Sequence, residues 1–125
     1  MIATESFLRG PIFSIDVVVN DGYCAVRDFL EQEIDSKART KIWALLDYIV
    51  NFGTPHNEEK FRNEGEGIYA LKTSEVRLYG FFDGQKLIVL TNGFKKFGRG
   101  GKKVQDRERK RAEQIRAELL RERST

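Results

Sequence analysis

The chain has 125 residues, 40% of them hydrophobic and 11% aromatic, which is enough for one small domain with a buried core. No apolar run is long enough to cross a bilayer, the N-terminus lacks the layout of a signal peptide, and the single Cys24 rules out an internal disulfide. These features argue against a membrane-spanning or disulfide-stabilised secreted protein, so we expect a cytoplasmic one.

The net charge of +3 is unevenly distributed along the chain. From Lys95 onward there are 12 Lys/Arg against 5 Asp/Glu, whereas the first 94 residues hold 10 Lys/Arg against 14 Asp/Glu. A basic C-terminal part on a mildly acidic body indicates a polyanionic or acidic partner, or simply a Lys/Arg-rich helix facing solvent.

The first half of the chain predicts one strand and two helices. Residues 1–10 lack periodicity and are expected to be a loose N-terminal extension, whereas the β-branched run at 12–19 predicts a strand. Apolar residues at helical spacing predict helices at about 25–34 and 36–51. The short connection between these helices favours a helical hairpin packed on a sheet.

The second half predicts a small sheet and a final helix. Residues 54–67 are polar and are read as a loop, and the last helix is expected at about 102–121. Asp83-Gly84 between two apolar runs predicts a two-residue hairpin turn. Three strands are expected, at 68–73, 76–82 and 86–91. The sequence therefore predicts an α+β domain over residues 11–125, with an antiparallel sheet and the C-terminal helix included.

Metal and nucleotide sites are not expected. One histidine, His56, and one cysteine cannot supply a zinc site of the usual spacing, and no glycine-rich nucleotide-binding loop is present. We therefore predict neither a metal nor a cofactor.

The basic residues around the predicted hairpin form the main candidate site. Arg77 lies inside a strand, where it either pairs with a carboxylate, stacks on Tyr79, or emerges to bind phosphate with its two-pronged guanidinium. Clustered cations stabilise a pentacoordinate phosphate, and a lysine of lowered pKa can accept a proton. The cations expected to surround one phosphodiester are Lys60, Arg62, Lys72, Arg77, Lys95 and Lys96.

Aromatic residues near these cations have two interpretations. They either stack on unpaired bases or belong to the core. The residues concerned are Tyr69, Tyr79, Phe94 and Phe97.

Three motifs in order resemble the RelE/ParE superfamily of bacterial toxins, and most closely its HigB-like branch, which includes many phage-derived proteins. They are IYALK at 68–72, RLY at 77–79 and GFKK at 93–96. The resemblance covers residues 67–99 best and extends over 12–66 through the order of elements. It implies the RelE-like fold, a small twisted antiparallel sheet with a two-helix hairpin on one face, followed here by a basic C-terminal helix.

The resemblance also implies a function. Such toxins cleave mRNA on the ribosome without a metal, through attack of the ribose 2′-OH on the adjacent phosphate, and a small antitoxin, here expected to be a helix-turn-helix protein, holds them inactive. It assigns catalytic roles to Lys72, Arg77, Lys95 and Lys96. Contacts with RNA are expected from Lys60, Arg62, Tyr79, Arg99, Lys102 and Lys103.

The chain departs from this branch in three respects. Ala70 stands where a glutamate is usual, FGRGG at 97–101 replaces a Thr/Pro stretch, and the C-terminal helix is longer and more basic than is typical. Two alternatives stay open: a ParE-like gyrase inhibitor, which belongs to the same superfamily, and a non-catalytic module that binds RNA or protein.

Overall fold

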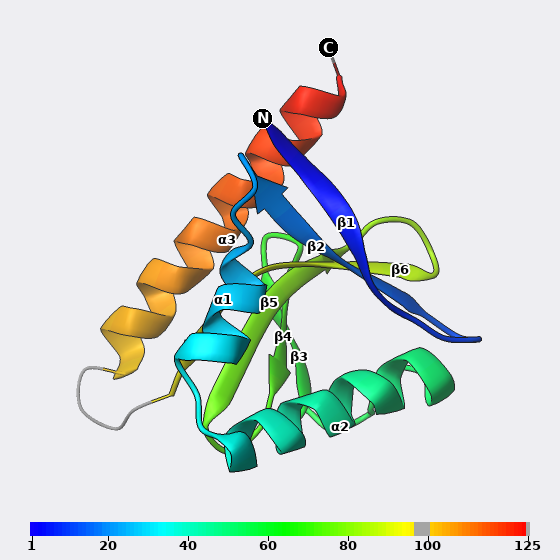
Figure 1. The fold of residues 1–125 in the computed structure, drawn as a ribbon, viewed down its shortest axis with the longest axis vertical. Coiled ribbons are helices and arrows are strands. Elements are labelled where there is room, and N and C mark those ends of the chain that lie inside the picture. The colour runs from blue at the N-terminus through cyan, green and yellow to red at the C-terminus, as the bar shows by residue number, and fades with distance from the viewer. Residues whose placement is uncertain (97–100, 125) are drawn as a thin grey trace.

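A six-stranded mixed sheet organises the fold, and its strands lie in the order β1-β2-β6-β5-β4-β3 (Figure 1). The computed structural model describes residues 1–96 and 101–124. Neighbouring strands are antiparallel except β2 and β6, which run parallel. In chain order the strands are β1 (Ile2–Arg9), β2 (Ser14–Asn20), β3 (Phe61–Gly65), β4 (Ile68–Lys72), β5 (Val76–Phe82) and β6 (Leu87–Lys95).

Three helices complete the fold: α1 (Ala25–Gln32), α2 (Ser36–Phe52) and α3 (Gly101–Arg123). The Asp35 side chain caps α2 by accepting a hydrogen bond from the Ala38 N–H at 2.8 Å, and Gly53 ends this helix with a φ of 102°. These signals explain why α2 was predictable from the sequence, whereas its steep angle to α1 (Figure 1) was not. None of the helices within the described residues is long and apolar enough to span a membrane.

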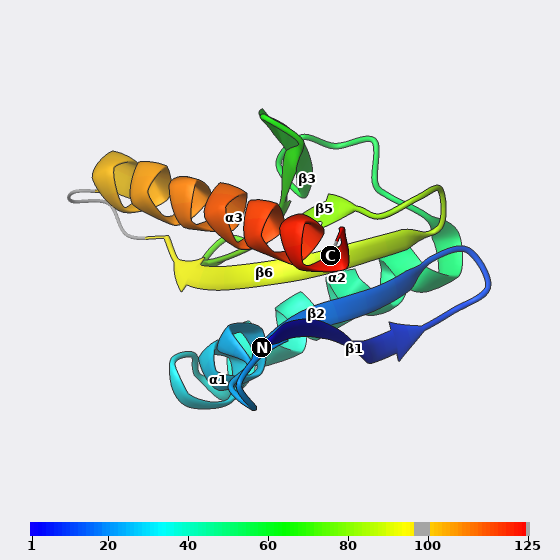
Figure 2. The same ribbon diagram turned by 90° about the horizontal axis from the view of Figure 1, so that it is seen from above.

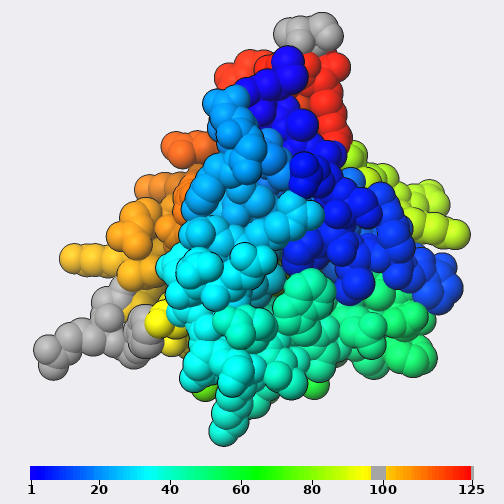
Figure 3. Space-filling view, viewed as in Figure 1, coloured from blue at the N-terminus to red at the C-terminus, as the bar shows by residue number. Residues whose placement is uncertain are grey.

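The sheet lies between two helical layers, with α1 and α2 on one face and α3 on the other (Figure 2). Ile88 and Leu90 pack toward α1 and α2, whereas Val89 packs toward α3 with Leu119. The apolar run of β6 is thus covered on both faces, as its sequence indicates. Figure 3 shows α1, α2 and the β1–β2 hairpin forming one continuous surface on their side of the molecule. The predicted α+β class is confirmed, and the arrangement is consistent with a RelE-like fold.

The structure corrects three predictions. Residues 2–9, expected within a loose extension, form β1, which pairs with β2. The expected loop at 54–67 contains the edge strand β3, which pairs with β4. The hairpin connection spans residues 83–86 rather than two residues, although Gly84 does adopt the positive φ of 85° that favours glycine. Both missed strands lie at sheet edges, where few side chains are buried, so the sequence shows no clear apolar pattern.

Helix α3 docks on the sheet through a thin apolar stripe. This stripe also contains one buried carboxylate. Glu108 is buried, and the buried Asn92 amide of β6 donates to its backbone oxygen at 3.0 Å and to its Oε1 at 3.3 Å. Arg111 lies 3.5 Å from the same carboxylate. A polar residue that interrupts the stripe therefore attaches the helix instead of turning it toward solvent.

Candidate functional site

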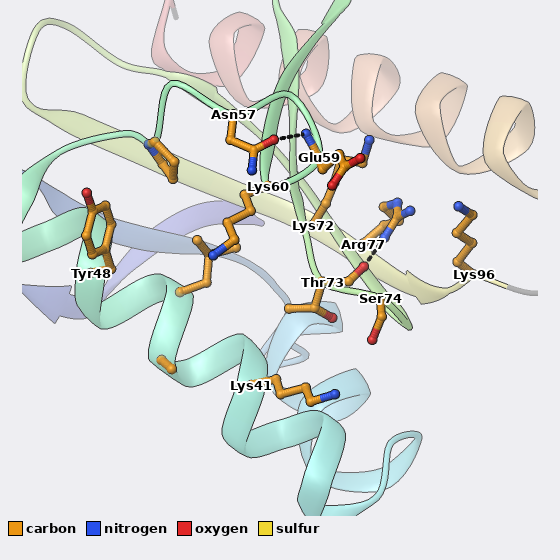
Figure 4. A pocket seen from close by; sticks show the side chains of 13 residues that line it. Lys41, Tyr48, Asn57, Glu59, Lys60, Lys72, Thr73, Ser74, Arg77 and Lys96 are labelled. Atoms are coloured by element: carbon orange, nitrogen blue, oxygen red, sulfur yellow. Dashed lines mark hydrogen bonds between the residues drawn. The ribbon is translucent and has the colours of Figure 1, made fainter.

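A pocket of about 870 Å³ opens beside α2, where β4 and β6 end and β5 begins (Figure 4). Five cationic side chains and one carboxylate, Glu59, line it, together with smaller polar and apolar residues. The cations are Lys41, Lys60, Lys72, Arg77 and Lys96. This excess of positive charge makes the pocket suitable for an anion.

Strand register places three of these cations together. Lys72 of β4 is paired directly with Arg77 of β5, so the two side chains leave the same face of the sheet. The backbone N–H of Lys96 donates to the Glu75 oxygen at 2.8 Å, which brings the residue after β6 against the β4–β5 turn. The basic cluster is therefore built on hydrogen-bonded strands and not on a loose loop.

Arg77 is buried and makes no ion pair within the described residues. Its side chain is mostly covered, with a relative exposure of 7%, and its Nη1 donates to the backbone oxygens of Thr73 and Val76. Among the described residues no carboxylate lies within ion-pair distance of it. Burial lowers the pKa of the Arg77 guanidinium, which means that the site disfavours the bare cation and favours an incoming anion.

Lys72 is also electrostatically perturbed. Burial, and next the positive charge of Arg77, lower the pKa of its amine. Its Nζ donates to the backbone oxygen of Glu58 at 3.1 Å. The loop that supplies this oxygen is ordered by Asn57, whose side chain accepts from the Glu59 N–H at 2.9 Å and whose backbone oxygen accepts from the Lys60 N–H at 2.9 Å. Lys60 is thereby fixed at the pocket wall.

A second, smaller pocket of about 430 Å³ continues from the first toward the start of α3. Arg77 and Lys96 line both pockets, and Lys102 and Asp106 of α3 line only the second. Because the two pockets share Arg77 and Lys96, they form a continuous basic path from α2 to the start of α3.

Other residues predicted for the site lie elsewhere. Lys95 lines neither pocket; it pairs with Val76, whose side chain faces α1 and α2, while its neighbour Phe94 faces α3. Arg62 and Lys103 are exposed but also line neither pocket. Arg99 lies outside the described residues.

Tyr79 corrects the prediction of an RNA-stacking residue. It has no exposed surface and packs beneath α3 against Phe94, with ring centroids 5.3 Å apart. Burial raises the pKa of its phenol to about 12, and its hydroxyl has no hydrogen-bond partner in the described part of the chain. Tyr79 is a core residue in this structure and presents no ring face to RNA.

Helix α2 contributes residues that sequence reasoning missed. Lys41 and Tyr48, both on its exposed side, line the large pocket (Figure 4). The helical periodicity identifies them as solvent-facing, but only the packing of α2 against the sheet places that face at the pocket.

The departure at Ala70 has a packing explanation. Ala70 is fully buried and lies in the same cluster as Tyr79 and Ala112 of α3. A glutamate side chain would have to be accommodated in the space where α3 approaches the sheet, so the small residue suits the docked helix.

The arrangement supports chemistry on a phosphate ester. Arg77 and Lys96 supply fixed positive charge, and Lys72 supplies an amine whose neutral form is favoured by its surroundings. Within the described residues, no group of three or more His, Cys, Asp or Glu side chains is placed to hold a metal ion.

Comparison with known proteins gives one result. The sequence profile of the family described as phage-derived protein Gp49-like (DUF891) matches residues 29–117, which includes α2, the large pocket and most of α3. A comparison with curated proteins finds no match.

Proposed function

The chain belongs to the phage-derived Gp49-like family, a family of RelE-type toxins, and on this premise we propose that it is a toxin that cleaves mRNA on the ribosome. The finer assignment to the HigB-like branch is part of the same proposal. The observation that carries it is the buried Arg77, which has no ion-pair partner in the described part of the chain and lies among four lysines in one pocket. A cognate antitoxin would then hold the protein inactive.

The proposed reaction is an intramolecular transesterification at one phosphate of the RNA. The 2′-oxygen of one ribose forms a bond to the adjacent phosphorus, and the bond from phosphorus to the next 5′-oxygen breaks. The products are a 2′,3′-cyclic phosphate and a free 5′-hydroxyl. Arg77 stabilises the added negative charge of the pentacoordinate phosphate through paired N–H groups, and Lys60 adds positive charge from the opposite wall.

Proton transfer is assigned to two lysines. Lys72, whose pKa is lowered by burial, accepts the proton of the 2′-hydroxyl in its neutral form. Lys96, which lines both pockets beside Arg77, donates a proton to the departing 5′-oxygen. Lys95 has no part in this scheme, because it does not line the pockets.

Induced expression in bacteria tests the proposal. The wild-type chain is expected to arrest growth with cleaved cellular mRNA, and Arg77→Ala to relieve both effects. Lys86→Ala is the matched control, because Lys86 is an exposed cation in the loop at the far end of the β5–β6 hairpin. Harmless wild-type expression with intact translation would show that the proposal is wrong.

Expression and binding measurements together separate the alternatives. A ParE-like gyrase inhibitor would produce gyrase-linked DNA breaks while mRNA stays intact. A non-catalytic module would bind RNA with a steep salt dependence and yield no cleavage product with or without ribosomes.

A further inference from the structure

We propose that Tyr48, with Phe52 beside it, is a stacking platform for one unpaired RNA base next to the phosphate-binding residues. This inference rests on the proposed RNA-cleaving function and adds a base-binding subsite contributed by α2. It assigns to that helix a role in substrate recognition in addition to its role in the core.

Tyr48 and Phe52 are exposed although both are large aromatic residues. Their relative exposures are 47% and 73%, and their ring centroids are 5.3 Å apart. They lie one helical turn apart, whereas Leu45 and Ile49 of the same helix are buried in the core. The aromatic pair therefore contributes little to the core.

The position of Tyr48 connects it to the cationic residues. It lines the large pocket, at the opposite end from Arg77 and Lys96, with Lys60 and Lys72 between them (Figure 4). A single-stranded nucleotide offers the matching order of groups, a flat base followed by a charged phosphate. The pocket volume of about 870 Å³ falls within the range of roughly 300–1,000 Å³ typical of small-molecule sites.

Charge decides between RNA and a protein as the occupant. Ala44, Leu45 and Pro55 also line the pocket. The core of a protein–protein interface is depleted of charged residues, however, whereas this wall carries Lys41, Lys60 and Lys72. Aromatic rings within a basic groove are the usual way to bind single-stranded nucleic acid, because every base has a face that stacks. Phe52 does not line the pocket, so it is a positioning residue that restricts the Tyr48 ring.

Binding of a short RNA that cannot be cleaved tests the inference. The probe is a fluorescently labelled six-residue 2′-O-methyl oligoribonucleotide, which lacks the attacking hydroxyl, measured by anisotropy at low salt. Tyr48→Ala is expected to weaken binding about 5- to 150-fold, the range found for loss of one base–aromatic stack, and Tyr48→Phe to retain most of the affinity. Tyr23→Ala is the matched control, since Tyr23 is 54% exposed and does not line the pocket.

Two further readouts identify what Tyr48 contacts. The Tyr48→Ala effect should disappear with an oligomer of the same length that carries abasic sites. For the Tyr48→Ala variant, the slope of log affinity against log salt concentration should match that of the wild type. The Arg77→Met variant should show a slope reduced by about 0.7, the value for one phosphate contact of a single strand.

Several results would overturn the inference. They are absence of wild-type binding to the oligomer, an unchanged affinity in Tyr48→Ala, or an equal loss on intact and abasic oligomers, which would show that Tyr48 does not contact a base. Base-dependent binding without ribosomal cleavage would sustain the subsite and reject the proposed function. Ribosomal cleavage with no effect of Tyr48→Ala on binding would support the proposed function and reject the base-binding subsite.

Discussion

Replacing Arg77 with methionine should separate its role in the site from any role in stability. The guanidinium is buried, and its Nη1 donates to the Thr73 and Val76 oxygens. Loss of two hydrogen bonds lowers the free energy of unfolding by about 1–3 kcal/mol. Removal of the buried cation also removes its desolvation penalty, which is of the order of several kcal/mol and offsets this loss. Val76 O also keeps the Thr73 N–H as donor at 3.0 Å. We expect the free energy of unfolding to change by no more than about 1 kcal/mol.

The same variant should lose nearly all cleavage activity. Removal of one donor that stabilises a transition-state oxyanion typically lowers kcat by about 10²- to 10³-fold. Ribosome-dependent cleavage, normalised to the folded fraction, measures this loss. Urea unfolding followed by the fluorescence of Trp43, which stacks on Phe7 at 5.0 Å, measures stability.

Arg39→Met is the matched control for this prediction. Its guanidinium also donates to three backbone oxygens, those of Leu30, Glu31 and Ile34, but it lines neither pocket. It should lose about 1.5–4.5 kcal/mol of stability and keep its cleavage rate per folded molecule. If Arg77→Met instead loses more than about 3 kcal/mol, and its activity follows only the folded fraction, the reasoning about Arg77 is refuted.

Three other predictions concern pH, the docking of α3 and the core. The lowered pKa of the Lys72 amine should make cleavage rise with pH below that pKa, and Lys72→Met should abolish the dependence; a slope retained in this variant would exclude Lys72 as the base. Because the folded protein holds the Lys72 proton less tightly than the unfolded chain, this group opposes folding at neutral pH, and less so as pH rises toward its ordinary range. Asn92→Ala leaves the buried Glu108 without its amide donor and should cost about 1–3 kcal/mol in urea unfolding, whereas an unchanged midpoint would show that α3 docks without it. Gly93→Ala places a methyl 2.6 Å from a Phe29 ring carbon and should cost about 1–3 kcal/mol, and a gain in Tm would contradict this packing.

The well-buried elements were predictable, and the edge strands were not. The heavily buried β5 and β6 and the capped α2 carry strong local patterns. β1 has a register shift between Ser6 and Leu8 that breaks its alternation, and β3 is mostly polar because an edge strand buries little. The parallel pairing of β2 with β6 joins distant segments, which no local pattern specifies.

The cations of the site were partly predictable for a similar reason. The order of the last strands places Lys72 beside Arg77, and the structure adds Lys60 and Lys96 to the same pocket. Lys95 was expected there from the GFKK motif, and Tyr79 from its place near Arg77. Strand alternation turns Lys95 away from the pockets, and the docked α3 covers Tyr79. Lys41 and Tyr48 depend on how α2 packs, which is a tertiary property.

The central claim is most directly tested with purified protein and ribosomes programmed with a defined mRNA. Mapping the ends of the products should show cleavage only when ribosomes are present, with a 2′,3′-cyclic phosphate on one fragment and a 5′-hydroxyl on the other. Arg77→Met should lack these products, and Lys86→Ala should form them at the wild-type rate. Intact mRNA with the wild-type protein, or equal cleavage by Arg77→Met, would contradict the account.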